Sequence, residues 1–489
     1  MMQDTALSFG TPPEWDEETD IAIIGSGYAG LAAAAAALES GAGTVRVVIL
    51  EKMPYPGGNS IISGGGYCSS DSKLKLREKL SLGEDSWQLH MDDTIKGGAN
   101  QSLPELAEVM AKKAPDGLNM FIDAGVEFAG TLPRMGGHSA HRSYLTVAND
   151  GKALYDPLRS LALSKGAELR LKTAVTRIWR ASPYAPVEGV QFDAGGAVKN
   201  LRVKRALIMA SGGFSRDVEM RVRYNPQLTD AYNCTNHKGA TGECIRMAQA
   251  VGAGVIHMEH IQLFPTANPD TGLLDKYALA AYSGTGYGAL NVDRTGRRFV
   301  NELGGRDEVS NVQITSCDKP TYTILNRAIF VALDVAPATI DSGVTAGRVI
   351  AAETISSLAG ALGMPYLVST VETHNGYITG SNRTAAAGEA DPEFGKPISA
   401  HMIPMTQGPY YAIPQWPAVH FCMGGLRFDT DAHVLGADGV PIPRFYAAGE
   451  CCGGLHGANR IAGNAIAECI VFGRIAGARA ALEDSIPIM

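Results

Sequence analysis

The sequence lacks the cysteine spacings that bind metals or attach haem. Its eight cysteines are scattered, without a CxxC or CxxCH pair and without the Cys and His spacing of a zinc finger. This excludes a zinc finger and a c-type haem attached to this chain, and we predict no metal site. Scattered cysteines are typical of reduced thiols in a cytoplasmic protein. For the adjacent Cys451 and Cys452, buried thiols and a vicinal disulfide are the two alternatives.

Long hydrophobic runs are also missing. The longest wholly apolar run, Leu31–Leu38, has eight residues, whereas a bilayer-spanning helix needs about 20. We therefore expect no transmembrane segment. The N-terminal stretch is acidic and has no signal-peptide core, so we expect a flexible arm over residues 1–18 and a cytoplasmic location.

Charge is scarce and slightly negative. Charged residues make up 19% of the chain, and 42 Lys and Arg against 50 Asp and Glu give a net charge of −8. A mildly acidic chain is a poor binder of nucleic acid, and we predict no such partner. A length of 489 residues with 45% apolar residues indicates a globular protein of about two to four domains.

What is present near the N-terminus is a strand–turn–helix–strand pattern. The apolar strand 20–24 runs into the glycine-rich turn GSGYAG at 25–30, and an alanine-rich helix follows over 31–40. A second apolar strand, 45–50, ends at the acid Glu51. This is the order of elements in a unit that binds a dinucleotide.

Each residue of this pattern has a physical role. Gly25 permits the tight turn, Gly27 lets a pyrophosphate approach the backbone, and Gly30 lets the helix pack closely on the strand. The N-terminus of the helix faces the phosphates, and Glu51 can accept hydrogen bonds from ribose hydroxyls. The sequence therefore predicts dinucleotide binding.

Further glycine-rich segments favour FAD over NAD. A polar loop at 52–60 and the segment SGGG at 63–66 follow the ribose acid, which suits a ligand that extends beyond the adenosine. A strand ending in an acid, 445–450, precedes a second glycine-rich turn at 453–465, and a middle strand covers 205–211. These segments predict an α/β fold in which both ends of the chain build one Rossmann-like FAD-binding domain.

Several of these motifs carry a family resemblance that extends over residues 20–485. The chain resembles the flavoprotein subunits of fumarate reductases and succinate dehydrogenases, and it is most similar to their soluble, flavocytochrome-type branch. The shared motifs are GSGYAG, PGGNS, GHSAHR at 137–142, ASGGF at 210–214, NHKGATGE at 236–243, RRFVNE followed by GRD at 297–307, HFCMGG at 420–425 and AAGE followed by HGANR and GNA at 447–465.

The resemblance implies a division of the chain. The FAD-binding domain would comprise residues 19–263 and 420–489, and an α+β capping domain would be inserted over 264–419. The active site is expected between these domains.

The resemblance also implies how FAD is held. In the covalent branch of the family a His in the loop after the ribose acid is attached to FAD, whereas this chain has Asn59 and Ser60 there. We therefore expect non-covalent FAD. The expected cofactor-binding residues are Gly25, Gly27, Tyr28, Ala29, Gly30, Glu51, Lys52, Gly58, Asn59, Ser60, Gly65, Gly66, Val175, Ser211, Gly212, Gly213, Glu450, Asn464, Ala465 and Ile466.

The chemistry of the family is hydride transfer between flavin N5 and a carbon of the substrate, with proton exchange at the neighbouring carbon. Such a reaction needs a cationic clamp and a positioned proton donor or acceptor. By resemblance, Arg460 and His420 form the clamp on a carboxylate, for which the planar fork of Arg is suited. Arg306 matches the family's proton-donating Arg.

Three departures from the family pattern indicate a changed substrate. Phe264 stands where the family has a His that holds the second carboxylate of fumarate, so a dicarboxylate loses a hydrogen bond to a charged group, worth about 1.5–3 kcal/mol. Tyr282 and Thr285 replace the Glu and Arg of the family's proton relay. Tyr282 is either a new proton donor or acceptor, or an aromatic wall.

These residues predict a substrate with one polar and one apolar end. Arg460 and His420 would hold a carboxylate or carbonyl, and an apolar ring would face aromatic side chains. The expected substrate pocket consists of Phe264, Thr285 and Tyr287, and Tyr282 joins the catalytic group.

The motifs that the sequence lacks bear on the direction of the reaction. With no haem motif and no FMN-attachment region in the sequence, we favour a dehydrogenase, or desaturase, of a cyclic ketone or keto acid that passes electrons to O₂ or a quinone. The alternatives are an arylacrylate-type or enoate-type reductase supplied by an external reductase, and, from another class, a non-catalytic flavin-binding electron-transfer subunit.

Overall fold

The computed structural model describes residues 6–381 and 390–485. The chain divides into two compact units. Unit 1 comprises residues 1–227, 236–261 and 421–489, and unit 2 comprises 228–235 and 262–420. The chain passes from one to the other at 227–228, at 235–236 and within the strands β10 (Ile261–Phe264) and β15 (Ala418–Cys422), which pair with each other.

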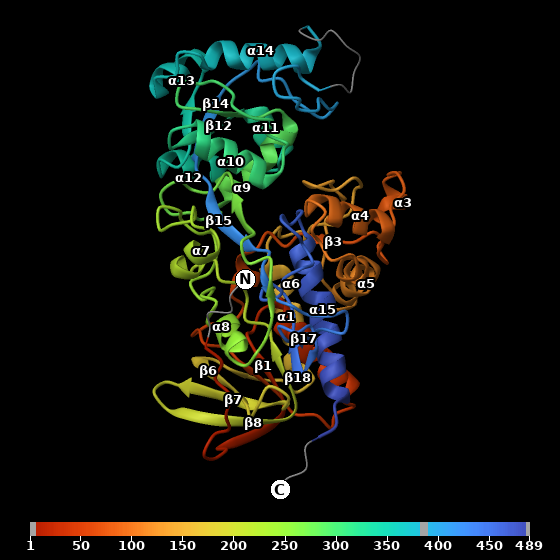
Figure 1. Cartoon of the computed structure of the whole chain (residues 1–489). Helices are drawn as coiled ribbons and strands as arrows, with labels where there is room; N and C mark the ends of the chain where they lie inside the picture. The colour runs from red at the N-terminus through yellow and green to blue at the C-terminus, as the bar shows by residue number, and fades with distance from the viewer. Residues whose placement is uncertain (1–5, 382–389, 486–489) are drawn as a thin grey trace. The chain divides into compact units, whose positions relative to one another are not determined.

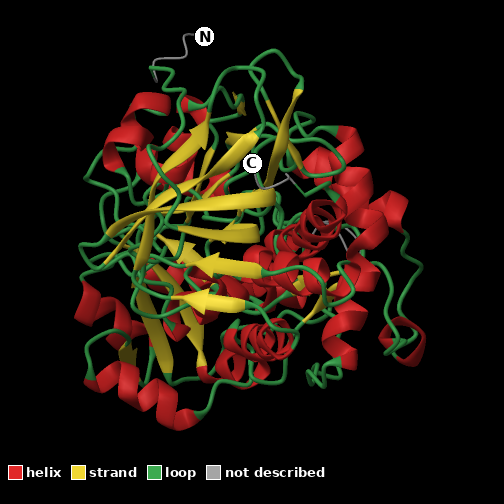
Figure 2. Ribbon diagram, turned by 90° about the horizontal axis from the view of Figure 1, so that it is seen from below, coloured by secondary structure: helices red, strands yellow, loops and turns green. Residues whose placement is uncertain are grey.

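Unit 1 is built on a sheet of eight strands with the path β17-β18-β8-β1-β2-β5, to which β6 and β7 are attached. The pairs β18–β8, β8–β1, β1–β2 and β2–β5 are parallel. The strands are β1 (Glu17–Ile24), β2 (Val47–Leu50), β5 (Glu168–Arg170), β6 (Thr173–Arg180), β7 (Val187–Ala194), β8 (Val198–Met209), β17 (His433–Leu435) and β18 (Pro441–Ala447). Figure 2 shows the strands as a twisted layer, and the predicted α/β fold is confirmed.

The two ends of the chain meet in unit 1. The alanine-rich helix α1 (Tyr28–Ser40) packs along α15 (Asn464–Leu482), and these are the red and blue helices that lie together in Figure 1. Glycine makes this contact close, because a Cβ at Gly477 would lie 2.0 Å from the carbonyl oxygen of Ala33. Both ends of the chain therefore contribute to one domain.

Shorter elements complete unit 1. Its other helices are α2 (Asn59–Ile62), α3 (Leu76–Lys79), α4 (Trp87–Gly97), α5 (Pro104–Asp123), α6 (Lys152–Ser164), α7 (Val218–Tyr224) and α8 (Glu243–Ala250), and its short strand pairs are β3 (Tyr67–Cys68) with β4 (Ser143–Tyr144) and β9 (Val255–Ile256) with β16 (Gly425–Leu426). Among the described residues, no helix has the length and hydropathy needed to cross a bilayer.

The N-terminal arm differs from the expectation of a flexible segment. Of the predicted arm, residues 1–5 lie outside the described residues. From Ser8 onward the chain lies against unit 1: the Ser8 amide donates to the carbonyl of Ala250 at 2.7 Å, and the Asp16 amide donates to that of Asn200 at 3.0 Å. Pairing of these backbone groups holds the segment in place before β1 begins.

Unit 2 contains a four-stranded antiparallel sheet in the order β11-β12-β14-β13. Its strands are β11 (Leu290–Val292), β12 (Thr321–Asn326), β13 (Ile350–Ala352) and β14 (Tyr410–Gln415), and its helices are α9 (Lys276–Gly284), α10 (Arg306–Ser316), α11 (Arg327–Ala332), α12 (Pro337–Thr345), α13 (Ile355–Leu362) and α14 (Leu367–Thr379). The side chains of Leu290, Ile324, Phe330 and Leu367 are fully buried in the core of this unit.

A buried ion-pair network lies inside unit 2. The Arg298 guanidinium pairs with Glu302 at 2.9 Å and with Asp391 at 3.1 Å, and the Lys396 ammonium lies 3.2 Å from Glu302. These four side chains are at most 1% exposed. Burial alone would raise the pKa of Glu302, but Lys396 and Arg298 outweigh it and lower the pKa to about 2.

Candidate active site

A groove in unit 1 forms where the ends of β1 and β2 meet the N-terminus of α1. Gly25 has a φ of +103°, and a Cβ there would lie 2.4 Å from the carbonyl oxygen of Ala210. A Cβ on Gly30 would lie 2.1 Å from the carbonyl oxygen of Gly25. The turn therefore requires glycine at both positions, as the dinucleotide pattern demands.

The acid at the end of β2 is fixed by its neighbours. Glu51 Oε2 accepts hydrogen bonds from the Ser26 amide at 3.2 Å and from the Ser26 hydroxyl at 2.6 Å, and Oε1 accepts from the Met53 amide at 2.9 Å. The Gly57 amide donates to the same Ser26 hydroxyl at 3.0 Å. Ser26, which the sequence reasoning missed, thus joins the first glycine-rich turn to the second loop.

The second loop is tied to the groove through Asn59 and Ser60. The Tyr28 amide at the start of α1 donates to the Ser60 hydroxyl at 2.8 Å. The Asn59 side chain accepts from the His237 amide at 2.7 Å and donates to Glu450 Oε2 at 3.3 Å. Asn59 therefore links three segments that are distant in the sequence.

The groove collects most of the predicted cofactor residues. Those that line it are Gly25, Gly27, Tyr28, Ala29, Glu51, Lys52, Gly58, Asn59, Ser60, Val175, Ser211, Gly212 and Glu450. The predicted residues outside this lining are Gly30, Gly65, Gly66, Gly213, Asn464, Ala465 and Ile466. Lining residues that the sequence reasoning missed are Ile24, Ser26, Leu50, Met53, Gly57, Thr173, Ala210, His237, Gly239, Ala240, Glu243, Cys244, Ala448, Gly449 and Cys469.

Two side chains of unit 1 have well-defined surroundings near these segments. The amide of Asn464 is bound to His90 Nε2 at 2.8 Å and donates to the Thr94 hydroxyl at 2.9 Å. The Arg460 guanidinium lies 4.8 Å from the centre of the Phe421 ring, and its Nη1 donates to the Ile461 carbonyl at 3.1 Å.

The adjacent cysteines are thiols. Cys451 and Cys452 are both buried and free, with their sulfur atoms 4.0 Å apart, whereas a disulfide bond is about 2.05 Å long. The alternative of a vicinal disulfide is therefore wrong.

Unit 2 brings Arg306 together with three aromatic side chains. Arg306 is the first residue of α10, and its guanidinium carbon lies 4.7 Å from the Phe264 ring centre and 5.1 Å from that of Tyr282. The Phe264 ring in turn lies 5.0 Å from both the Tyr282 and the His420 rings. Cation–π contacts of this kind hold a guanidinium without neutralising it.

The polar partners of this group are uncharged. Arg306 Nε donates to the Tyr282 hydroxyl at 3.3 Å and Nη1 donates to Gln262 Oε1 at 3.4 Å. His420 Nδ1 lies 2.8 Å from the Thr235 hydroxyl. Within residues 6–381 and 390–485, no carboxylate forms an ion pair with Arg306, so its positive charge remains available for an anion.

Gln262 and Thr235 were missed by the sequence reasoning. Gln262 had a detectable signal, because residues i and i+2 of a strand share one face and Gln262 precedes Phe264 by two positions in β10. Thr235 is distant from His420 in the sequence and had no such signal.

Two predicted pocket residues lie outside this aromatic group. The Thr285 hydroxyl donates to the backbone carbonyl of Tyr282 at 2.8 Å, and its side chain is buried. Tyr287 is partly buried and packs against the hydrophobic core of unit 2. Their proposed contact with substrate rests on the family pattern alone.

Comparison with known proteins adds to this geometry. Residues 20–466 match the family described as FAD binding domain. The chain is 35% identical to a urocanate reductase of Eggerthella lenta, over 95% of this chain and 75% of the relative, and 33% identical to an acrylate reductase flavoprotein subunit of Shewanella woodyi, over 95% and 91%. The chain belongs to the fumarate reductase and succinate dehydrogenase flavoprotein family.

A longer relative and two solved structures are also similar to this chain. A flavocytochrome c3 fumarate reductase superimposes with a TM-score of 0.77 at 30% identity, over 96% of this chain and 78% of that one. The chain spans about half (47%) of an NADH:fumarate oxidoreductase of Klebsiella pneumoniae, to which it is 35% identical. A ketosteroid dehydrogenase with a TM-score of 0.74 and 22% identity shares the fold.

The family membership identifies the protein as an FAD-dependent oxidoreductase acting on carbon–carbon bonds, with a small-molecule substrate and an electron partner. The alternative of a non-catalytic subunit finds no support among relatives that are named as reductases. The groove of unit 1 fits FAD, because Gly25 and Gly30 leave no room for a Cβ and the Ser26 hydroxyl holds Glu51 in place beside the turn.

The flavoprotein is expected to release its cofactor on denaturation. By the family pattern, Asn59 stands at the position of the covalent His, and an amide forms no bond to flavin, so we expect FAD to be held by non-covalent contacts alone. Precipitation with trichloroacetic acid should leave all the flavin absorbance in the supernatant. Yellow colour retained in the washed pellet would contradict this prediction.

Glu450 gives the flavoprotein a pH dependence. Burial raises the pKa of Glu450 to about 7, although the Cys422 amide and Asn59 donate hydrogen bonds to the carboxylate and oppose the rise. A pKa raised above its unfolded value stabilises the fold at low pH, and this contribution is lost as the pH rises from about 4.5 through 7. On its own, this contribution lowers the urea midpoint of the cofactor-free protein at pH 8 relative to pH 5.5. Buried histidines such as His138, whose pKa burial lowers to about 4, act in the opposite direction between these pH values.

The variant Glu450→Gln isolates this effect. Glutamine is neutral at both pH values and keeps an oxygen for the Cys422 amide. The change in urea midpoint from pH 5.5 to pH 8 should therefore be more positive in the variant than in the wild type. An equal change in the two proteins would show that Glu450 does not contribute to the pH dependence.

Proposed function

We propose that this flavoprotein reduces the C=C bond of an α,β-unsaturated acid or ketone whose far end is an apolar ring. The observation that carries the proposal is the Arg306 guanidinium, which lies over two aromatic rings and has only neutral hydrogen-bond partners. An unneutralised cation favours an anionic substrate group and the negative charge that develops on the substrate during reduction.

The aromatic side chains support the apolar end of the substrate. Phe264 cannot donate the hydrogen bond by which the family holds a second carboxylate. Its ring instead lies against Tyr282 and His420. A dicarboxylate such as fumarate is therefore disfavoured, and a substrate with one polar end is favoured.

Tyr282 has a role in proton delivery under this proposal. FAD, when bound, supplies the hydride chemistry. A guanidinium is a very weak acid, so an Arg306 that gives a proton to the substrate needs a group that replaces the proton. The Tyr282 hydroxyl, 3.3 Å from Nε, is suited to this role. Arg460 and His420 are proposed to bind the carboxylate or carbonyl, on the family pattern.

Desaturation of a cyclic ketone or keto acid is the second candidate. It is favoured by the same contact, because Tyr is among the side chains that serve as a general acid or base, and the Tyr282 hydroxyl is placed beside the Arg306 cation. The lack of electron-transfer motifs in this sequence does not favour desaturation, since the chain spans only 47% of one relative and 75% of another.

An external electron partner is part of the proposal. One relative is named as an NADH-linked reductase and another as a cytochrome-type fumarate reductase. We propose that an external reductase supplies the electrons for reduction. For the second candidate, the acceptor would be O₂ or a quinone.

An anaerobic spectral titration tests the direction and the substrate class together. Dithionite-reduced holoenzyme is mixed with fumarate, trans-cinnamate, urocanate and cyclohexenone, and oxidised holoenzyme with cyclohexanone and cyclic keto acids. Reoxidation by the ring-bearing unsaturated compounds, with little by fumarate, is the expected result. Bleaching of the oxidised flavin by a saturated ketone would replace the proposal by the second candidate.

A further inference from the structure

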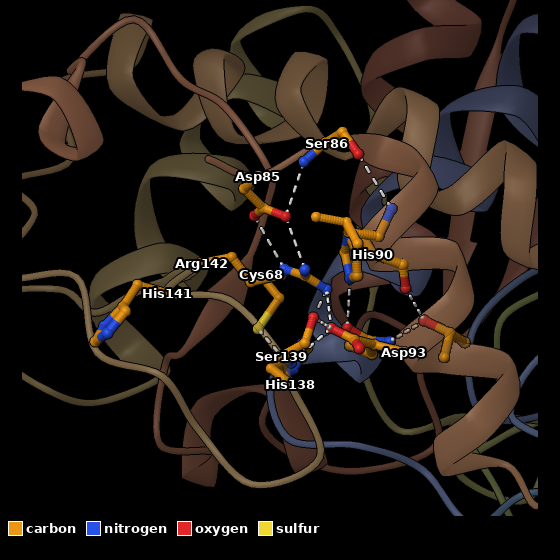
Figure 3. Close-up of polar contacts among 12 residues, drawn as sticks. Cys68, Asp85, Ser86, His90, Asp93, His138, Ser139, His141 and Arg142 are labelled. Carbon is orange, nitrogen blue, oxygen red and sulfur yellow. Dashed lines mark hydrogen bonds and ion pairs between the residues drawn. The ribbon is translucent and has the colours of Figure 1, made fainter. Parts of the chain in front are cut away.

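A buried polar cluster in unit 1 lies beside the turn that carries Arg460. Figure 3 shows its members, among them Cys68, Asp85, Asp93, His138 and Arg142. The GHSAHR motif supplies two of them, and the proposed function uses neither. Arg142 is fully buried and His138 is 6% exposed.

The cluster ends on a backbone carbonyl two residues after Arg460. His138 Nε2 lies 2.6 Å from the Ala462 carbonyl oxygen, and the Cys68 thiol donates to the same oxygen at 3.2 Å. The Ala462 amide donates to the carbonyl of Gly136 at 3.2 Å. The segment around His138 therefore binds both the carbonyl and the amide of Ala462, two residues after Arg460.

The hydrogen bonds define the tautomer of His138. A nitrogen 2.6 Å from a carbonyl oxygen must carry the proton, so Nε2 is the donor and Nδ1 is the acceptor. Arg142 Nη1 donates to that Nδ1 at 3.4 Å. Burial lowers the pKa of His138 to about 4, and the neutral ring keeps this arrangement near neutral pH.

Arg142 is itself immobilised by two carboxylates. Its Nε and Nη2 donate to Asp85 at 3.0 and 2.7 Å, and its Nη1 lies 2.8 Å from Asp93. A bidentate pair of this kind fixes the plane of the guanidinium. The chain of contacts therefore runs from Asp85 through Arg142 and His138 to the Ala462 carbonyl.

Packing leaves the Arg460 turn little room to move. A Cβ on Gly137 would lie 2.3 Å from Ile461 Cγ2, and a Cβ on Gly463 would lie 2.3 Å from the Cys68 sulfur. The turn is thus in direct contact with the segment around His138 on one side of Ala462 and with Cys68 of β3 on the other. Without the His138 hydrogen bond, the buried Ala462 carbonyl would be held by the Cys68 thiol alone. A thiol is a weak donor, so the carbonyl would be held poorly.

We propose that His138 is a positioning residue for Arg460: its Nε2–H holds the Ala462 carbonyl and thereby fixes the turn that carries the guanidinium. This inference rests on the proposed function, because it takes Arg460 to bind the anionic end of the substrate. His138 does not touch the substrate, and its effect passes through the backbone of the turn.

Three variants of the holoenzyme test the proposal. His138→Leu removes both hydrogen bonds of the ring. His138→Gln keeps an N–H for the Ala462 carbonyl and an oxygen for Arg142. His141→Leu is the matched control, because His141 points away from the cluster in Figure 3 and contacts the Leu132 carbonyl instead.

Hydrogen exchange measures the turn independently of any substrate. In His138→Leu, amides of the peptide 460–464 should exchange about tenfold faster than in the wild type, because the local opening becomes easier. Exchange in the cofactor turn 25–30 should not change. His138→Gln and His141→Leu should behave as the wild type. An unchanged rate in His138→Leu, or equal acceleration in His138→Gln, would overturn the proposal.

Kinetics separate positioning from a structural role. The probe is trans-cinnamate, or the acid of the panel that reoxidises the flavin faster. Its KM should rise about tenfold in His138→Leu with kcat changed about threefold at most, since a misplaced clamp weakens binding, and His138→Gln should restore it. Faster exchange without a change in KM would leave only a structural role and overturn the proposal.

Failure of the proposed function has a different signature. If Arg460→Ala leaves the KM for the acid unchanged, the clamp role of Arg460 is wrong, and the inference that His138 positions a clamp falls with it. If no unsaturated acid reoxidises the flavin, the exchange rates alone decide whether His138 holds the turn.

Discussion

Replacing Arg306 by alanine is expected to lower kcat about a thousandfold while FAD remains bound. In the described chain, no other guanidinium lies over both Phe264 and Tyr282. Loss of a proton donor or of a charge-stabilising donor lowers the rate by about 10²–10⁴. The measurement is single-turnover reoxidation of the reduced flavin by the acid identified in the titration, with bound FAD determined from the absorbance spectrum.

Arg297→Ala provides a matched control for this variant. Arg297 also lies over an aromatic ring of unit 2, at 3.6 Å from the centre of Tyr366, but it is exposed. Its replacement should leave the rate of reoxidation unchanged. A rate in Arg306→Ala within about tenfold of the wild type, below the usual effect of a catalytic donor, would remove Arg306 from the mechanism.

Replacing Glu302 by glutamine is expected to destabilise unit 2 strongly. The substitution leaves Arg298 with Asp391 and the partly exposed Glu393, and it removes the carboxylate that lies 3.2 Å from the buried Lys396 ammonium. Breaking a buried pair by removing one partner costs about 3–5 kcal/mol, which corresponds to a fall in Tm of about 10 °C for a unit of this size. Differential scanning calorimetry of the holoenzyme measures the shift.

The control for Glu302 is an exposed ion pair. Glu108 pairs with Lys112 one helical turn away, and both side chains are more than 40% exposed. Glu108→Gln should change Tm by about 3 °C at most, because an exposed pair contributes about 0–1 kcal/mol. Equal shifts in Tm in the two variants would show that burial does not determine how strongly the loss of an ion pair destabilises the protein.

Local sequence signals were sufficient for much of the fold. The order of strand, glycine-rich turn, helix and acid places Gly25, Gly30 and Glu51 as the structure has them, because the geometry of such a turn admits few other residues. The second glycine-rich turn correctly indicated that both chain ends build one domain. The pairing of β18 with β8 and the contact of α15 with α1 follow from that arrangement.

Contacts between distant segments could not be derived in this way. The hydrogen bonds of Asn464 to His90 and Thr94, and that of His138 to the Ala462 carbonyl, join residues with no shared local pattern. The tertiary fold alone brings such partners together. Thr285 is a different case, because its hydroxyl binds the backbone carbonyl of Tyr282 only three residues earlier, which is a local contact.

The strand order of unit 1 has a consequence for biosynthesis. β1, β2 and β8 leave the ribosome early, but the neighbour of β8 in the sheet is β18, and α1 packs on α15. Unit 2 emerges in full before β18 and can fold first, since domains fold as units during translation. The groove needs Ala448, Gly449 and Glu450 in addition to the first glycine-rich turn. We therefore expect FAD to bind late in synthesis, after β18 and residues 448–450 have left the ribosome.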